Sequence, residues 1–171
     1  MKLRKIETLI SERRIRRRVA ELGREISAYY RKKHLTVIFI SNGALVFAAD
    51  LIRNINLPIH IDSISASSYT GTRSAGKIKI STGVKVDIRN RHVLVVDDIL
   101  DTGRTLSKAI SVIEKHHPEG IRTCVLLEKL SKKMIPITAD FVGFEIPDVF
   151  VVGYGLDYNE YYRNLPYIGV F

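Results

Sequence analysis

The fold of this chain is decided by one stretch of sequence, Val93-Leu94-Val95-Val96-Asp97-Asp98-Ile99-Leu100-Asp101-Thr102-Gly103-Arg104-Thr105-Leu106. It opens with a continuous apolar run, which is typical of a central strand buried on both faces of a parallel sheet. Two carboxylates end the expected strand, and a tight turn then leads into a helix. Because ligands bind at the carboxyl ends of the strands in open α/β sheets, we expect a binding site at this point.

The turn over residues 101–105 predicts a phosphate-binding loop. Its successive backbone N–H groups and the positive end of the following helix converge on one point. Gly103 permits a close approach of the backbone, and the hydroxyl groups of Thr102 and Thr105 can add hydrogen-bond donors. The two carboxylates before the turn are placed to accept hydrogen bonds from sugar hydroxyls or to reach a divalent cation.

A purely structural explanation of these acidic residues is weaker. Asp97 and Asp98 could simply end a strand, and Asp101 could cap the helix that follows. However, three like charges placed this close together are costly unless a cation, hydroxyl groups or a ligand compensates them. We therefore expect all three carboxylates to belong to a ligand site.

The rest of the chain alternates between short β-rich runs and helical stretches. Strands that alternate with helices require crossover connections, so we expect an α/β fold with a central, mostly parallel, twisted sheet flanked by helices. The apolar periodicity predicts helices from 15 to about 30, over 44–54 and over 105–115. The same patterns predict strands at 36–40, 59–65, 93–98, 121–127, 141–144, 149–154 and 167–170, and a hairpin of 78–80 with 84–86.

The 171 residues favour a single domain, spanning 1–171, with the composition of a soluble globular protein. The chain carries 27 Lys and Arg against 18 Asp and Glu, a formal net charge of +9. Such a charge attracts polyanions but does not distinguish nucleic acid, a membrane surface or a small polyphosphate. Five arginines, which we expect on the solvated face of the first helix, are Arg13, Arg14, Arg16, Arg17 and Arg18.

Several other classes of protein are disfavoured. The single cysteine, Cys124, lies in an apolar strand pattern and cannot form an intrachain disulfide, which favours a reducing compartment. We find neither a leader-like apolar segment nor a run long enough to span a membrane, so we expect a cytoplasmic protein without a membrane partner.

The histidines lack zinc-ligand spacing. The stretch 71–77 begins like a nucleotide-binding P-loop, but Ile78 and the strand pattern after it exclude that motif.

Residues 93–105 closely resemble the phosphoribosyl diphosphate (PRPP) binding motif of the type I phosphoribosyltransferases. That motif consists of an apolar strand, two acidic residues, two apolar residues, Asp-Thr-Gly and a closing Thr, all present here. Residues 140–166 resemble the purine-binding hood of the hypoxanthine-guanine branch of this family. Over roughly residues 35–170, the resemblance implies a type I phosphoribosyltransferase fold with a small hood subdomain, formed by parts of the N-terminal segment and about 139–171.

The resemblance implies an enzyme of purine salvage. It would transfer the 5-phosphoribosyl group of PRPP to N9 of a 6-oxopurine, hypoxanthine or guanine, and release IMP or GMP and pyrophosphate. Mg²⁺ is the implied cofactor, and PRPP and the base are the implied partners. The family also implies a homodimer or homotetramer, and we expect no nucleic acid as a partner.

The site residues carried over from the family fall into groups. Asp101 would be catalytic, beside purine N7. PRPP and its ribose would be bound by Asp97, Asp98, Asp101, Thr102, Gly103, Arg104 and Thr105. Purine would be bound by Lys129 at the 6-oxo group, Phe150 by stacking and Val151 through its backbone. Pyrophosphate would be bound by Asn42, Gly43 and Arg163, Mg²⁺ by Asp97, Asp98 and Asp157, and the loop that closes over the site would carry Ser68 and Tyr69.

The sequence also departs from the family pattern and leaves alternatives open. Asn42 stands where many members carry a lysine, so the expected cation beside pyrophosphate is absent there. Arg73 or Lys77 of the covering loop could reach the pyrophosphate instead. Two other functions are compatible with the same fold: an RNA-binding regulator of nucleotide synthesis, suggested by the basic charge, and an enzyme that uses another base such as xanthine.

Overall fold

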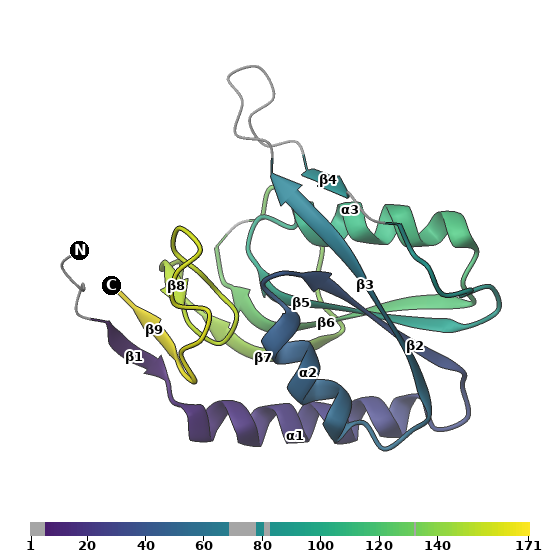
Figure 1. Ribbon diagram of the computed structural model, residues 1–171, viewed down its shortest axis with the longest axis horizontal. Coiled ribbons are helices and arrows are strands. Elements are labelled where there is room, and N and C mark those ends of the chain that lie inside the picture. The colour runs from purple at the N-terminus through teal and green to yellow at the C-terminus, as the bar shows by residue number, and fades with distance from the viewer. Residues whose placement is uncertain (1–5, 69–77, 81–82, 132) are drawn as a thin grey trace.

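The computed structural model describes residues 6–68, 78–80, 83–131 and 133–171, and its centre is a twisted six-stranded sheet (Figure 1). Five neighbouring strands run parallel, and the edge strand β4 pairs antiparallel with β3. The predicted α/β fold with a mostly parallel sheet is therefore confirmed. In spatial order the strands are β4 (Ile78–Ile80), β3 (Ile59–Ser68), β2 (Leu35–Ser41), β5 (His92–Leu100), β6 (Gly120–Lys129) and β7 (Phe141–Ile146).

Helices cover both faces of this sheet. Helices α1 (Glu12–Tyr29) and α2 (Leu45–Asn54) lie on one face, and α3 (Arg104–Ile113) lies on the other (Figure 1). Alternate residues of β5 enter the two separate cores: Leu94 and Val96 pack with α1 and α2, whereas Val93 and Val95 pack with α3. Since side chains alternate across a strand, the apolar run had to be buried on both sides.

Some predicted boundaries were wrong. Strand β5 continues through the two carboxylates to Leu100, so Asp97 and Asp98 lie within the strand and do not end it. Helix α3 ends at Ile113, and residues Glu114–His116 form a 3₁₀ turn. The predicted strand at 149–154 is reduced to β8 (Val151–Val152), because the chain turns through positive φ angles at 153–155.

The predicted hairpin of 78–80 with 84–86 is also wrong. Ile78–Ile80 is a strand, but it pairs with residues 66–68 of β3. The backbone N–H groups of Lys85 and Val86 instead donate to Asp62 Oδ2, at 2.6 and 3.1 Å. A side-chain carboxylate has therefore replaced the strand partner that the alternating pattern implied.

A second, three-stranded sheet joins the two ends of the described chain. Its order is β1 (Glu7–Ile10), β9 (Ile168–Val170) and β8, and all its pairings are antiparallel. Strand β1 was not predicted from the sequence, whereas β9 matches the strand expected at 167–170. The segment 139–171 contains three strands. Strand β7 belongs to the six-stranded sheet, and only β8 and β9 belong to this second sheet.

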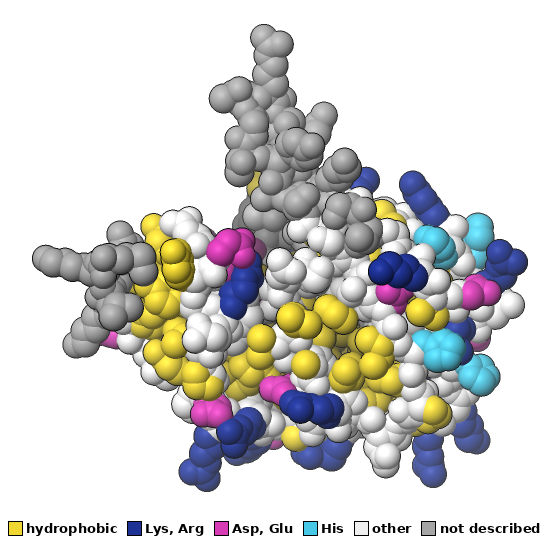
Figure 2. All heavy atoms as spheres, in the orientation of Figure 1, with side chains coloured by type: hydrophobic (Ala, Val, Ile, Leu, Met, Phe, Trp, Pro, Cys, Tyr) yellow, Lys and Arg dark blue, Asp and Glu magenta, His cyan; other side chains and the backbone are white. Residues whose placement is uncertain are grey.

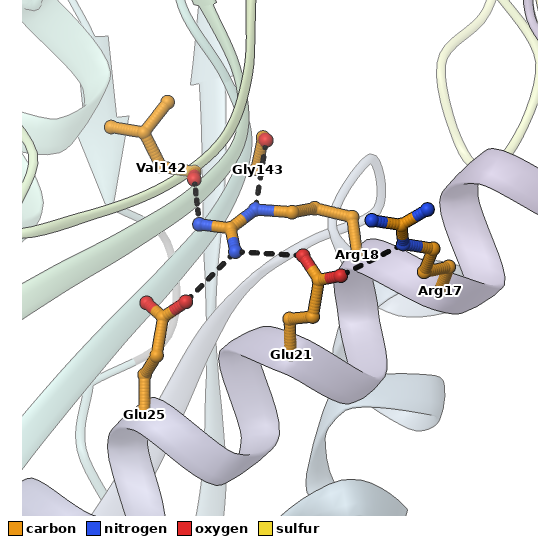
Figure 3. Close-up of polar contacts among 6 residues, drawn as sticks. All are labelled: Arg17, Arg18, Glu21, Glu25, Val142 and Gly143. Atoms are coloured by element: carbon orange, nitrogen blue, oxygen red, sulfur yellow. Dashed lines mark hydrogen bonds and ion pairs between the residues drawn. The ribbon is translucent and has the colours of Figure 1, made fainter.

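One of the five arginines expected on the solvated face of α1 is a structural clamp. Arg18 donates to the carbonyl oxygens of Val142 and Gly143 at 2.9 and 3.1 Å, and it pairs with Glu21 and Glu25 (Figure 3). Its side chain is three-quarters buried and ties α1 to the edge strand β7. Arg16 and Arg17 remain exposed and pair with acidic side chains one helical turn away.

Candidate active site

A cleft of about 680 Å³ opens at the carboxyl ends of the central strands. It is bordered by the segment after β2, the end of β5, the turn into α3 and a segment from the C-terminal part of the chain. This is the position predicted for a ligand site in an open α/β sheet. The charged and loop residues that line it include Asn42, Gly43, Asp97, Asp98, Asp101, Thr102, Gly103, Thr105, Asp157, Glu160 and Arg163.

The turn between β5 and α3 is braced from behind. The carbonyl oxygen of Thr102 accepts hydrogen bonds from the N–H groups of Met134 and Ile135, both at 3.1 Å. Gly103 has a φ of +82°, and a Cβ there would come within 2.7 Å of the carbonyl oxygen of Ile135. Only glycine fits this conformation and spacing, and the N-terminus of α3 is thereby held at the cleft, where an anion is favoured.

Two carboxylates, Asp97 buried and Asp98 partly buried, lie beside this turn. Asp97 is only 5% exposed, and burial together with the negative charge of Asp98 raises the pKa of Asp97 well above its usual value. Burial also raises the pKa of Asp98. Such a pair is stabilised by hydroxyl donors or by a cation, which are the groups that a ribose or a metal ion would bring.

The segment after β2 and the loop at 153–155 meet next to these acids. A Cβ on Gly43 would overlap the carboxylate of Asp98, and a Cβ on Gly155 would overlap the carbonyl oxygen of Gly43. The Tyr154 hydroxyl donates to Asp50 Oδ2 at 2.6 Å, which links the C-terminal loop to α2. The peptide bond between Ser41 and Asn42 is cis. The contacts of Gly43 with Asp98 and with Gly155 enclose the segment after β2 on two sides.

Arg163 brings a positive charge to the cleft. Its guanidinium donates to the carbonyl oxygen of Gly155 at 2.8 Å and pairs with Asp157 at 2.8 Å and Glu160 at 3.1 Å. The N–H of Glu160 donates to Asp157 Oδ2 at 2.8 Å. The cation is therefore positioned by its own loop, and Glu160 is a lining residue that the motif comparison did not indicate.

Lys129 connects the cleft to a neighbouring group of residues. Its ammonium lies 3.1 Å from Asp101 Oδ2 and 2.9 Å from Asp148 Oδ1. Burial lowers the pKa of Lys129, but the hydrogen bonds to Asp148 and Asp101 outweigh it and raise the pKa above its usual value. Lys129 is therefore a charged hydrogen-bond donor beside Asp101, the acid that begins the turn into α3.

A group of aromatic side chains lies around β8 and the C-terminal residue. Phe150 is 56% exposed, and its ring lies 6.2 Å from that of Phe171 at an interplanar angle of 18°. Tyr158 contacts both rings edge to face. The half-exposed ring of Phe150 is available for stacking, and Val151, which follows it, is buried in β8.

The carboxylates of the cleft fit a magnesium ion that is coordinated by both the protein and a substrate. Asp97, Asp98 and Asp157 all line the cleft, and carboxylate oxygens are the ligands Mg²⁺ prefers. Among the described residues, no cluster of three His, Cys, Asp or Glu side chains surrounds one point. A bound Mg²⁺ would thus take one or two of these carboxylates and complete its shell with phosphate and water oxygens.

Comparisons with known proteins find relatives along nearly the whole chain. Residues 6–159 match the phosphoribosyl transferase domain family. The chain is 42% identical to a hypoxanthine phosphoribosyltransferase of Haemophilus influenzae, covering 99% of this chain and 97% of that protein. It is 44% identical to a hypoxanthine-guanine phosphoribosyltransferase of Bacillus subtilis, covering 96% and 92%.

This chain belongs to the phosphoribosyltransferase family. A crystal structure of a hypoxanthine-guanine phosphoribosyltransferase from Bacillus anthracis superposes with a TM-score of 0.92 at 43% identity, covering 98% of this chain and 99% of that one. The fold and the hypoxanthine-guanine branch inferred from residues 93–105 and 140–166 are thus confirmed, and the chain is an enzyme of this class.

In this phosphoribosyltransferase the expected site residues fall into two groups. The acids of β5, most of the phosphate-loop turn, and the predicted pyrophosphate and metal residues line one cleft. Arg104 is the first residue of α3 and does not line the cleft. The cleft is also not lined by the three expected purine-binding residues, Lys129, Phe150 and Val151. Ser68 ends β3, whereas Tyr69, Arg73 and Lys77 lie outside the described residues. Asp148 was not identified from the sequence, since no motif marks it.

No helix in the described part of the phosphoribosyltransferase is long and apolar enough to cross a membrane.

Proposed function

We propose that this phosphoribosyltransferase transfers the 5-phosphoribosyl group of PRPP to N9 of hypoxanthine or guanine and releases pyrophosphate. The observation that carries the proposal is the contact of Lys129 with Asp101, because it joins a phosphate-binding turn to a donor suited to a 6-oxo group. An ammonium group donates hydrogens and accepts none, so it favours an oxygen at position six over an amino group.

The binding roles follow from the positions of the groups. The turn at 102–105 and the N-terminus of α3 bind the 5′-phosphate. Asp97 and Asp98 accept hydrogen bonds from the ribose hydroxyls. Arg163 and the backbone at 42–43 contact the pyrophosphate, while Phe150 stacks on the purine and the Val151 backbone meets its exocyclic position. Asp157, with Asp97 or Asp98, would hold Mg²⁺, and the ion would supply positive charge to neutralise the pyrophosphate.

The reaction separates charge, and the site residues match that need. The bond from the anomeric carbon to the pyrophosphate oxygen breaks while a bond from that carbon to purine N9 forms. Positive charge develops on the ribose and negative charge on the leaving group, where Arg163 lies. Asp101 accepts the proton of the purine or stabilises its charge at N7.

The experiment is an assay of the purified protein with PRPP, Mg²⁺ and, in turn, hypoxanthine, guanine, xanthine, adenine and uracil. We expect turnover with hypoxanthine or guanine and little with adenine or uracil. Turnover of uracil alone, or of none of the bases, contradicts the proposal. The xanthine arm decides whether that base is also a substrate.

The RNA-binding alternative receives little support from the surface. Lys and Arg side chains project along the margin of the molecule that α1 forms (Figure 2), but Arg16, Arg17 and Arg18 are paired with acidic side chains of the same helix. RNA binding driven by phosphate contacts weakens steeply as salt rises. Filter binding at increasing salt concentration, run beside the base assay, separates the two functions.

Three further features remain proposals. We propose that the three-stranded sheet β1-β9-β8 and its loops form the hood of a single domain, 1–171. A homodimer or homotetramer is expected from the family, and light scattering of the purified protein measures it. The cytoplasmic location predicted from the single, buried Cys124 is measured by cell fractionation.

A further inference from the structure

The register of the strands places Asp148 in a row with Asp101 and Lys129. Leu100 at the end of β5 pairs with Glu128 of β6, so Asp101 and Lys129 follow at neighbouring positions. Lys129 in turn pairs with Ile146 at the end of β7, and Asp148 comes two residues later. Three adjacent parallel strands therefore present Asp101, Lys129 and Asp148 in order along one sheet edge.

The ammonium of Lys129 is shared between the two acids. It lies 3.1 Å from Asp101 and 2.9 Å from Asp148, and the Lys129 side chain is only 11% exposed. A lysine ammonium has three N–H donors, and the two carboxylates use separate donors, so Asp148 keeps its hydrogen bond when another acceptor takes the place of Asp101. The Asp148 side chain is 63% exposed, which leaves room for it to stay in contact when a base arrives.

We propose that Asp148 is a positioning residue for base recognition, which holds the Lys129 ammonium in place while the 6-oxo group of the purine replaces Asp101 as its partner. The inference rests on the proposed function and deepens it. Asp101 is neutralised by Lys129 before the base binds, and it is released to face purine N7 when Lys129 turns its donor to the base. Asp148 keeps the ammonium from following Asp101.

The turn that carries Asp148 couples this contact to the stacking residue. The N–H of Val149 donates to the carbonyl oxygen of Pro147 at 2.9 Å, and that of Leu130 donates to the carbonyl oxygen of Ile146 at 3.0 Å. Asp148 is therefore fixed on a short turn anchored beside Lys129, two residues before Phe150. Its carboxylate is held by the same backbone that places the aromatic ring.

The test compares Asp148→Ala, Asp148→Glu and the control Glu145→Gln, which removes an exposed carboxylate three residues away on β7. For Asp148→Ala we expect KM for hypoxanthine to rise about tenfold, with KM for PRPP within twofold of the parent, because one charged hydrogen bond to the ammonium is lost. The preference for hypoxanthine over adenine, taken as the ratio of kcat/KM, should fall by a similar factor. Asp148→Glu should recover most of both effects, and Glu145→Gln should change neither.

Two results would overturn the inference. One is a KM for hypoxanthine unchanged in Asp148→Ala; the other is an equal rise in both KM values, which would mean a general distortion of the site. Thermal unfolding of each variant checks that the fold persists, as the exposure of Asp148 leads us to expect. A parent protein without phosphoribosyl transfer would refute the proposed function itself, and is distinguished from these results by the parent assay.

Discussion

The Asp98 carboxylate packs directly against the Cα of Gly43, so that a Cβ at position 43 would overlap it. The relationship joins the segment after β2 to the acidic end of β5. It also explains why glycine follows Asn42, because the Asp98 carboxylate occupies the place where a side chain at position 43 would begin. The segment after β2 approaches strand β5 so closely that the Asp98 carboxylate packs directly against the segment proposed to bind pyrophosphate.

Gly43→Ala should therefore lower the use of PRPP. The added methyl group must push the Asp98 carboxylate aside, and overpacking of this kind costs about 1–3 kcal/mol. We expect kcat/KM for PRPP to fall roughly 10- to 100-fold. Gly83→Ala is the matched control, since a Cβ there meets nothing within 4 Å. Equal kinetics for the two variants would show that the Gly43–Asp98 contact is unimportant.

Asp101→Asn should remove most turnover and leave PRPP bound. The amide cannot accept a proton as a carboxylate does, and loss of such a group lowers kcat by roughly 100-fold or more. PRPP binding, measured by calorimetry with Mg²⁺ present, should stay within a few-fold of the parent. The role proposed for Asp101 is wrong if kcat is retained, or if PRPP binding falls as far as kcat does.

Asp62→Asn should loosen the segment after β4. The Asp62 side chain is partly buried, which by itself raises its pKa, but hydrogen bonds from the N–H groups of Lys85, Val86 and Ser63 outweigh this and lower the pKa. Because the folded pKa lies below the unfolded value, the stabilisation is present above the unfolded pKa and is lost as the pH falls through the folded pKa.

Urea unfolding at two pH values measures this effect. At pH 6 we expect Asp62→Asn to lower the free energy of unfolding by about 1 kcal/mol. The difference from the parent should shrink as the pH falls through the folded pKa of Asp62, which lies below its usual value, because the carboxyl group then becomes protonated in both states. Glu145→Gln serves as the control for loss of an exposed carboxylate. A difference that persists unchanged at low pH would contradict the assignment.

Arg18→Lys should destabilise the protein although the charge is kept. Lysine cannot reproduce the planar set of donors that contacts Val142, Gly143, Glu21 and Glu25 together. We expect a loss of about 1–3 kcal/mol in the free energy of unfolding. Arg17→Lys, at an exposed arginine with a single pairing on the same helix, should cost less than about 0.5 kcal/mol. Similar losses in both variants would argue against the clamp.

Much of the fold could be predicted because its signals are local. The apolar run at 93–96 predicts a strand buried on two faces, and alternating strands and helices imply parallel crossovers. Strand β1 was missed because Glu7–Ile10 is short and mostly exposed, and it becomes a strand only through pairing with β9. The predicted hairpin failed because a carboxylate from β3 took the N–H groups that the pattern assigned to a strand.

The order of residues alone determined the chemistry available: two acids directly after an apolar run, a Gly-containing turn into a helix, and a lysine after a second apolar run. Only the tertiary structure decided which of these groups meet. The placing of Asp148 beside Lys129 depends on the register between β6 and β7, and that of Gly43 beside Asp98 on the close approach of the segment after β2 to strand β5. Pairings between residues far apart in the chain are set by packing, for which no short sequence pattern exists.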